Sequence, residues 1–306
     1  MPLKGYNRKL LTIGFKNLVI KNKGLKKLIS NNLKKKISYQ DIGFSIGPLI
    51  NSSGRIAKAN DVVELFLSRN DYRIDNILNK MNNHNLKRKK IEQENLDLID
   101  FKKYYNKKVI FIYNKNFHEG IIGIIAAKLS QIFNKPCFII TESNDVLKCS
   151  IRSGSNLKIN KTINKLIANK LIISGGGHDE AGGFTAQKAD LANIEDFLKN
   201  EYKTLETKNY RYFDAFAIFP KKNSSIINDL KHLEPFGKDN PEPIFYFKDV
   251  KSIKSKIINN RHVQNILKNK SGRTIKGISF DCVNSELGYY LLNFKKEFDL
   301  IGCIVE

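Results

Sequence analysis

The segment SGGGHDEAGGF, from Ser174 to Phe184, places five glycines around one histidine, directly after a short apolar stretch. Residues with so little side chain cannot form a core, but they allow another molecule to approach the backbone closely. The backbone N–H groups of a glycine-rich turn can bind an anion, and a histidine can donate a hydrogen bond to a phosphate oxygen. The pattern therefore favours a phosphate-binding loop over a tight turn with a structural histidine. The candidate residues are His178, Gly176, Gly177, Gly182 and Gly183.

Two basic stretches could contact the same kind of ligand. In GPLINSSGRI, residues 47–56, Asn51 and Arg55 lie close to a glycine, and a guanidinium can bind phosphate through two hydrogen bonds. In CSIRSGS, residues 149–155, Ser150 and Arg152 are two positions apart, so on a strand they point to the same face. The plainer alternatives are a loop with a helix start for the first stretch and an exposed strand face for the second.

The other histidines carry weaker signals. His118, in FHEGIIG, precedes a predicted helix N-terminus, where the helix dipole favours an anion. His84 and His232 lie in polar helical stretches, which predicts solvated side chains. His262 opens a strand in a basic segment and is expected at the surface.

The sequence does not indicate a metal or thiol site. A metal-dependent phosphoesterase needs several carboxylates and imidazoles that converge on its cations. The sequence has no Asp-x-Asp, Asp-His-His or His-x-x-x-Asp cluster. Its four cysteines lie far apart without a Cys-x-x-Cys pair, which argues against a zinc site and against a disulfide framework. A reducing cytoplasm is therefore the expected location.

The elements that must position these residues begin with helices. Residues 6–20 carry apolar side chains at helical spacing, and a second short helix is expected to begin at Gly24. SYQD, residues 38–41, has the Ser-x-x-acid form of a helix start. From Asn60 to about Lys103 there is no proline or glycine, which predicts a helical hairpin or a long connecting helix.

From residue 107 onward, strands and helices alternate. The predicted strands are residues 107–114, 136–141 and 146–153, with a short one at Phe184, and the predicted helices are residues 119–133, 160–169 and 190–202. Strand, helix, strand predicts a parallel pair with a right-handed crossover. We therefore expect an α/β domain with a mixed sheet over residues 106–205.

After Thr204 the pattern is mainly that of strands. Candidate strands are residues 212–219, 243–258, 262–269, 274–281 and 297–306, with helices at 224–233 and near 285–291. Five short strands in about a hundred residues fit a small barrel of the oligonucleotide-binding (OB) type.

The net charge of +23 favours a polyanionic partner, most often nucleic acid. The joint richness in Lys, Asn and Ile also fits A/T-rich codons, in which case the lysines only solvate the surface. No apolar run reaches the length of a membrane span, and the N-terminus has no signal-peptide pattern, so we expect no membrane partner.

Taken in order, these stretches resemble the RecJ family, the bacterial single-strand-specific 5′→3′ exonucleases of the DHH phosphoesterase superfamily. The stretches that resemble successive family motifs are SIGPLINSSGRI, NHNLKRKKIEQE, HEGIIGIIAAKL, SIRS and GGGHDEAGGF, the last three being motifs of a DHHA1 domain. The glycine segment alone would fit any DHHA1 protein, including alanyl-tRNA synthetase and small phosphodiesterases. HLEPFGKDNPEPIF, residues 232–245, resembles the signature that leads into the RecJ OB domain and narrows the resemblance.

The resemblance implies three parts. They are a helical remnant of the DHH domain with the connecting helix (residues 1–105), a DHHA1 domain (106–205) and an OB-like barrel (206–306) that still needs a closing strand. Mn²⁺ or Mg²⁺ is the implied cofactor, held by ligands of a DHH domain that precedes this region in the family. The chain is accordingly expected to be trimmed at both ends.

The implied partner is single-stranded DNA, with either a separate DHH-domain chain or a single-strand-binding protein as a further one. Arg55, Ser150 and Arg152 would hold the 5′ end and adjacent phosphates. His118 would line the cleft between the DHH domain and this part of the chain. His178 and its glycines would face the metal across that cleft, and His178 would take a catalytic role. The OB-like part would guide the strand by charge and by stacking on Phe236, Tyr246 and Phe247.

Different function classes remain open. The chain is either the DNA-binding DHHA1 and OB part of an exonuclease, or a catalytically inactive single-stranded nucleic-acid binder or accessory subunit. A tRNA-editing or cyclic-dinucleotide DHHA1 protein would leave the OB-like tail unexplained. An open barrel and an exposed apolar face near Leu10 to Ile20 could also prevent stable folding.

Overall fold

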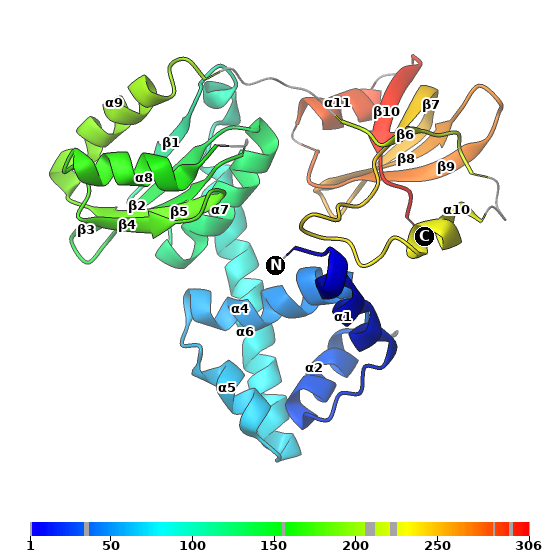
Figure 1. The fold of residues 1–306 in the computed structure, drawn as a ribbon, viewed down its shortest axis with the longest axis horizontal. Helices are drawn as coiled ribbons and strands as arrows, with labels where there is room; N and C mark the ends of the chain where they lie inside the picture. Colours follow the sequence, from blue (N-terminus) through cyan, green and yellow to red (C-terminus); the bar gives the residue numbers. More distant parts are fainter. Residues whose placement is uncertain are drawn as a thin grey trace. The chain divides into compact units, whose positions relative to one another are not determined.

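The structure, a computed structural model, describes residues 2–33, 37–154, 157–205, 212–220, 225–283, 285–293 and 296–305. The chain divides into two compact units, Val19–Asn209 and a second made of Met1–Leu18 with Tyr210–Glu306. Figure 1 shows the elements of each unit. Within the described residues, no helix is both long enough and apolar enough to cross a membrane.

The larger unit begins with a helical part. Its elements are α2 (Lys23–Asn32), α3 (Tyr39–Asp41), the π-helical turn η1 (Ile42–Ile46), α4 (Gly47–Ile56), α5 (Asn60–Leu67) and α6 (Asp71–Asp97). Ser38 starts α3 with a capping box, as SYQD predicts. After Asn60, where the sequence predicts a helical hairpin or a long connecting helix, the structure has two helices in contact, α5 and the long α6. Asn70 caps α6 by accepting from the Arg73 N–H. The apolar faces of α2, α4, α5 and α6 share one core.

A mixed sheet follows, as the sequence predicts. After η2 (Phe101–Tyr104), its strands β1 (Ile110–Tyr113), β2 (Cys137–Ser143), β3 (Val146–Arg152), β4 (Ser174–Gly177) and β5 (Ala181–Ala186) lie in the order β1-β2-β3-β5-β4. β1 and β2 are parallel and are joined by α7 (Glu119–Phe133), which confirms the predicted strand–helix–strand unit. The remaining pairs are antiparallel.

Helices cover the two faces of this sheet unequally. α7 packs on one face, over Ile110 and Ile139, whereas α8 (Ile159–Ala168) and α9 (Leu191–Glu201, after the short η3, Lys188–Asp190) pack on the other. The contacts of α7 fall on β2 and β3, and those of α8 fall on β4 and β5. The α7 side of β4 and β5 is therefore left without a helix of this sheet.

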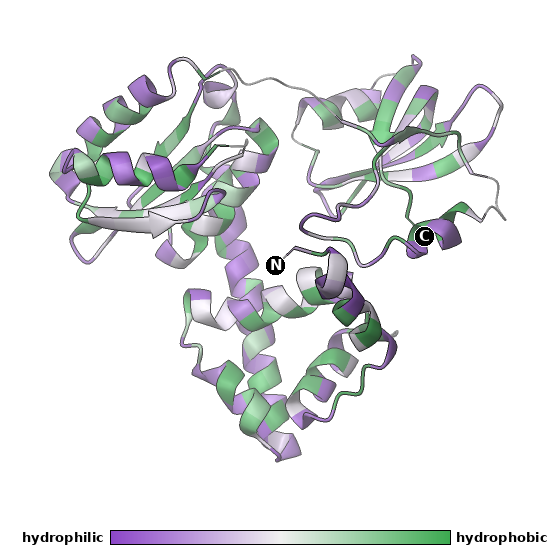
Figure 2. Cartoon of the chain, in the orientation of Figure 1, coloured by the Kyte–Doolittle hydropathy of each residue, from purple (hydrophilic) through white to green (hydrophobic). Residues whose placement is uncertain are grey.

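The glycine segment is a β-hairpin, so the loop predicted from the sequence is wrong. Its glycines lie in β4 and β5, where Gly176 pairs with Gly183 and Gly177 pairs with Gly182. None of the segment's glycines has a positive φ, so left-handed backbone is not the reason for them. Strand β4 is almost white in Figure 2, since glycine is neither strongly polar nor apolar.

The smaller unit contains the second sheet. Strands β7 (Phe245–Ile258), β8 (His262–Lys268), β9 (Thr274–Ser279) and β10 (Phe298–Gly302) lie in the order β10-β7-β8-β9, and β6 (Ala215–Phe216) pairs with β7. The strand predicted at 212–219 is thus reduced to two residues. Helices α10 (Ile226–Lys231) and α11 (Glu286–Asn293) fall where the sequence predicts them, although Ser224, the predicted start of the first, lies outside the described residues. The core contains Phe219, Phe247, Val250 and Leu267.

The N-terminal helix α1 (Gly5–Lys16) belongs to this smaller unit and packs on a segment near residue 235. Arg8 donates a 2.9 Å hydrogen bond to the His232 carbonyl. The Leu3 N–H donates to the Lys238 carbonyl at 2.7 Å. α1 has no buried residue, and Leu10 is 68% exposed, so the apolar face expected here is open to solvent.

Candidate nucleic-acid interface

Arg55 lies at the C-terminal end of α4, where this helix meets the start of α7. A Cβ on Gly120 would lie 1.9 Å from the Arg55 carbonyl oxygen, so only glycine allows this contact. Arg55 Nη1 donates to the Gly120 carbonyl at 3.1 Å. GPLINSSGRI is therefore a helix and not the loop considered from the sequence, with Asn51 exposed and Ser53 buried.

Arg88 joins Arg55. It lies in NHNLKRKKIEQE, a stretch that resembles a family motif, although it is not among the candidate site residues named from the sequence. It lies on α6, is 9% exposed and forms a 2.8 Å ion pair with Glu92, one helical turn further on. Burial lowers the pKa of Arg55, and the positive charge of Arg88 lowers it further. An arginine followed four residues later by a glutamate, inside a stretch with helical periodicity, is the sequence signal that could have found it.

Ser150 and Arg152 lie on the face of β3 that borders α7. A Cβ on Gly123 of α7 would be 3.2 Å from Ser150 Oγ and 3.9 Å from Arg152 Nη2. Arg152 Nη1 donates to the Ile151 carbonyl at 2.8 Å. Burial lowers the pKa of Arg152, and so does the charge of Arg55. Three guanidinium groups thus form an arginine cluster, defined as Arg55, Arg88 and Arg152.

The arginine cluster has more positive than negative charge. Glu92 pairs with Arg88, whereas neither Arg55 nor Arg152 forms an ion pair with a carboxylate of the described residues. Both are half-buried, so they lose part of their hydration, and Glu92, already paired with Arg88, offsets only part of the charge on Arg55. Guanidinium forks match the oxygens of a phosphate, so a phosphate group is the ligand that would compensate these charges best.

A surface without side chains extends from this cluster. Ile139, Ser150, Gly183 and Gly176 pair in turn across β2, β3, β5 and β4. Directly paired residues share one face of a sheet. α7 covers Ile139, but Gly183 and Gly176 continue the row as bare backbone, here called the glycine floor. Given the spacing of strands, the floor reaches about 10 Å from Ser150.

The five glycines of the segment have different reasons to be glycine. A Cβ on Gly175 or Gly182 would press against Ile163 of α8, at 2.9 and 2.5 Å. On Gly177 it would meet the Ala181 carbonyl oxygen at 2.4 Å, and on Gly183 the Cys149 carbonyl oxygen at 2.7 Å. A Cβ on Gly176 would meet nothing within 4 Å. Packing within the chain therefore explains the other four glycines of the segment but does not require a glycine at position 176.

The candidate histidines take separate positions. His118 is the N-cap of α7, and its Nδ1 accepts the Gly120 N–H at 3.1 Å, which already satisfies this helix end. His178 is exposed in the hairpin turn, and its backbone N–H donates to Ala181. His84 is half-buried and shares a 3.2 Å hydrogen bond with Ser53, so the solvated side chain predicted for it is wrong.

The described residues do not fit a divalent metal. They contain no group of three or more His, Cys, Asp or Glu side chains that could hold a metal ion. Asp179 and Glu180 in the hairpin turn are exposed neighbours in sequence without such a group around them. The Mn²⁺ or Mg²⁺ that the resemblance implies would therefore need ligands other than these residues.

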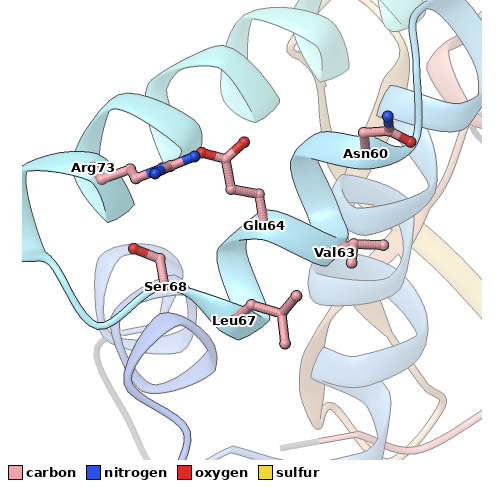
Figure 3. Close-up of a pocket in the computed structure, with 6 residues that line it drawn as sticks. All are labelled: Asn60, Val63, Glu64, Leu67, Ser68 and Arg73. Carbon is pink, nitrogen blue, oxygen red and sulfur yellow. The ribbon is translucent and has the colours of Figure 1, made fainter.

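A hollow of about 570 Å³ lies elsewhere, between α5 and the start of α6. Figure 3 shows that Arg73 and Glu64 point toward one another across it, and the two side chains form an ion pair. Val63 and Leu67 form its apolar wall. Its charges are mutually neutralised and it contains none of the candidate residues, so we assign no ligand to it.

The smaller unit has a basic face on the outer side of β7, β8 and β9. Lys251 pairs with Lys268, and Ile266 lies between Lys254 and Lys276 in the next row. With Lys256, these lysines are exposed and form no ion pair with a described carboxylate. Like charges directly opposite one another destabilise a sheet, so a bound polyanion would relieve the repulsion. We call Lys251, Lys254, Lys256, Lys268 and Lys276 the lysine face.

One end of the lysine face is aromatic. Phe280 is 73% exposed and meets His262 edge-on, with ring centroids 5.3 Å apart. Phe247, by contrast, is 3% exposed in the core, so its predicted role as a stacking platform is wrong. Tyr246 lies at the surface on the opposite half of β7, beside β6 and β10.

Two family models match the chain. The DHHA1 domain model matches residues 106–205, and the RecJ OB domain model matches residues 213–306. The single-stranded-DNA-specific exonuclease RecJ of Bacillus subtilis (strain 168) is 25% identical over 307 residues, covering 94% of this chain and 37% of RecJ. RecJ of Thermus thermophilus is 23% identical, covering 80% of this chain and 36% of RecJ. The chain thus spans little more than a third of these two relatives.

Solved structures agree on the fold. The crystal structure of RecJ from Thermus thermophilus in complex with Mn²⁺ matches with a TM-score of 0.81 at 20% sequence identity, covering 99% of this chain and 44% of that one. The same protein in complex with Mg²⁺ matches with a TM-score of 0.79 at 20% identity, covering 100% of this chain and 47% of that one. Such a likeness supports the predicted fold class, helices followed by a DHHA1 domain and an OB domain.

Proposed function

Because the chain carries the DHHA1 and OB domains of the RecJ family, we propose that it is the DNA-binding part of a single-strand-specific 5′→3′ exonuclease. The observation that carries this proposal is the pair of half-buried arginines, Arg55 and Arg152, that lack a carboxylate partner beside the glycine floor. The proposed substrate is a 5′-ended single strand, and the proposed processes are DNA repair and recombination.

The arginine cluster would hold the 5′-terminal phosphate. Arg55 and Arg152 each use one N–H group on a backbone carbonyl, so their other donors can bind phosphate oxygens. Ser150 Oγ, beside Gly123, would add a hydroxyl donor at the same place. A hydroxyl end lacks the charge that these guanidiniums can bind, so this arrangement discriminates 5′-phosphate from 5′-hydroxyl.

The glycine floor would carry the nucleotides that follow. Gly176 and Gly183 lie in the row of Ser150, so a strand bound at the arginine cluster can lie flat on backbone there. His178, in the turn that closes the hairpin, would then be near the DNA backbone. In that position it would take a catalytic role.

The lysine face would guide the rest of the strand by charge. Its lysines would release counterions from the phosphates, which gives sequence-independent and salt-dependent affinity. Phe280 at its aromatic end offers a ring on which a base can stack.

Hydrolysis would require metal ligands in addition to the described residues of this chain. Those ligands would come from a DHH domain, in the same or a separate chain. A second candidate function, strand binding without hydrolysis, is favoured by the absence of a three-ligand group among the described residues together with the basic surfaces.

Binding of labelled oligo(dT) with a 5′-phosphate or a 5′-hydroxyl tests the proposal by fluorescence anisotropy. We expect the phosphorylated strand to bind about tenfold tighter, and Arg152→Gln to remove most of that difference. Lys161→Gln on α8 is the control, since it removes a charge on the other face of the sheet. Equal affinity for both ends would contradict the phosphate site.

Incubation of the purified chain with 5′-ended single strands and Mn²⁺ tests the assignment of catalysis. We expect no degradation by the chain alone and degradation when a RecJ DHH domain is supplied. Degradation by the chain alone would contradict the need for further ligands. Strand binding that no DHH domain converts into hydrolysis would favour the non-catalytic function.

A further inference from the structure

The smaller unit exposes an aromatic patch, defined as Phe213, Phe216 and Tyr246. Their ring centroids lie 4.9 to 5.3 Å apart, so the three rings contact one another. Phe216 pairs with Tyr246 across β6 and β7, and Ile301 of β10 pairs with Tyr246 on its other side. Phe216 is nevertheless 74% exposed. An exposed row of this kind on a sheet indicates a contact surface.

The aromatic patch is bordered by carboxylates. Asp299 accepts a hydrogen bond from the Tyr246 hydroxyl and the Asp249 N–H. Asp214 lies between Phe213 and β6. Its N–H donates to the Ile244 carbonyl at 2.7 Å, and its carboxylate accepts from the Ile244 N–H at 2.8 Å.

Burial raises the pKa of the Cys303 thiol, and the nearby carboxylates of Glu242 and Asp214 raise it further. They are therefore close to the end of β10, which Cys303 follows. Lys270, paired with Asp249 at 2.9 Å, and Lys248 are the neighbouring cations near Asp299. Among the described residues, four carboxylates and two lysines make this region acidic, in a chain whose net charge is +23.

The sign of this charge separates the patch from the lysine face. Carboxylates repel phosphates, so the aromatic patch is poorly suited to nucleic acid although its rings could stack on bases. The phosphate-binding lysines lie on β8, β9 and the second half of β7. The aromatic patch lies on β6, β10 and the first half of β7.

We propose that the aromatic patch binds a cationic segment of a partner protein. An arginine or lysine side chain of that segment lies over the Phe216 ring, and neighbouring basic residues pair with Asp299, Asp214 and Glu242. Aromatic rings attract cations through their faces, and carboxylates around them add charge complementarity. This inference goes beyond the proposed function, because it assigns a protein partner to a surface that the DNA path does not use.

Fluorescence anisotropy with fluorescein-labelled nona-arginine and, separately, labelled oligo(dT) tests the proposal on the full chain. We expect Phe216→Ala and Asp299→Asn each to weaken peptide binding about fivefold and to leave oligo(dT) binding unchanged. Tyr289→Ala, which removes an exposed aromatic ring on α11, is the matched control and should change neither. Phe280→Ala should weaken oligo(dT) and leave the peptide unchanged.

Three outcomes overturn the proposal. Weaker oligo(dT) binding by Phe216→Ala would make the patch a base-stacking surface. A self-associated chain that becomes monomeric in Phe216→Ala, measured by sedimentation velocity, would make it a self-interface. If the peptide does not bind, or if neither variant changes its affinity, the patch is not a site for a cationic segment. Thermal melts of each variant exclude unfolding as the cause, since Phe216 lies outside the core.

Discussion

Gly120 packs directly on the backbone of Arg55. A Cβ at position 120 would lie 1.9 Å from the Arg55 carbonyl oxygen, and the Arg55 guanidinium donates to the Gly120 carbonyl at 3.1 Å. The closeness of α4 to α7, and hence the place of the first arginine in the cluster, depends on this glycine.

Gly120→Ala is therefore expected to push α4 away from α7. The variant should lose about 1–3 kcal/mol of unfolding free energy from overpacking, and its preference for 5′-phosphate should fall. Urea unfolding and anisotropy measure the two effects. Gly14→Ala is the control, because Gly14 lies in helix α1 with nothing within 4 Å of its added Cβ. An unchanged preference for 5′-phosphate would show that the contact between α4 and α7 does not position the arginine cluster.

Gly176→Val should separate stability from binding. Because a Cβ at Gly176 meets nothing within 4 Å, valine should leave the unfolding free energy unchanged or raise it by up to about 1 kcal/mol, as glycine is a poor strand residue. The isopropyl group would stand on the glycine floor and weaken binding of single strands. Gly177→Ala should do the reverse and destabilise the hairpin, since its Cβ would lie 2.4 Å from the Ala181 carbonyl oxygen. If Gly176→Val binds DNA normally, the strand does not cross the floor.

Arg88→Met should be costly because it leaves Glu92 buried and unpaired. The two side chains are 10% and 15% exposed, and breaking such a pair typically costs about 3–5 kcal/mol. The double variant Arg88→Met with Glu92→Met should recover most of that stability, measured by urea unfolding. It should not recover 5′-phosphate binding, because the cluster still lacks a guanidinium. Recovery of both would show that Arg88 only supports the fold.

Lys251→Gln with Lys268→Gln should reduce the salt dependence of strand binding. Each phosphate contact on a single strand contributes about 0.7 to the slope of log K against log salt, so the slope should fall by about 1.4. Stability should hold or rise slightly, since these lysines face one another across β7 and β8. Lys199→Gln, whose lysine is paired with Glu195 on α9, should leave the slope unchanged. An unchanged slope in the double variant would remove the lysine face from the DNA path.

Cys303 should be the cysteine that alkylating reagents reach in the folded chain, since the other three are buried. Burial first, and then Glu242 and Asp214, raise the pKa of its thiol, so less thiolate is present near neutral pH and alkylation is slow. Glu242→Gln should lower that pKa and speed alkylation by iodoacetamide, which mass spectrometry can follow across pH. A slower reaction in this variant would place Glu242 away from the thiol.

Local patterns were sufficient for the elements but not for the site. The periodicity of residues 119–133 and the capping box at Ser38 depend on neighbours in sequence, so both were predictable. The row from Ser150 to Gly176 depends on the register of three strands, which no local pattern fixes. The glycines were recognised, but their strand conformation was not, because turn composition and strand-to-helix packing both call for small residues.

Faces of strands were hard to assign for a related reason. Phe247 and Phe280 are both aromatic residues in predicted strands, yet one is buried and the other is 73% exposed. Register shifts in β7, between Ser252 and Lys254 and opposite Phe298, change which side chains point inward. Each shift moves later residues to the opposite face, so alternation alone could not separate core from surface.

The contact between Arg8 and His232 joins residues 224 positions apart. On the ribosome, α1 is made before the segment on which it packs, with a delay of roughly 10 to 45 s at usual rates of synthesis. The whole unit Val19–Asn209 emerges during that time and can fold, while Tyr6, Leu10 and Ile13 of α1 wait without the segment that anchors the helix. The order of translation therefore lets α1 reach its native place only after the whole unit Val19–Asn209 has been made.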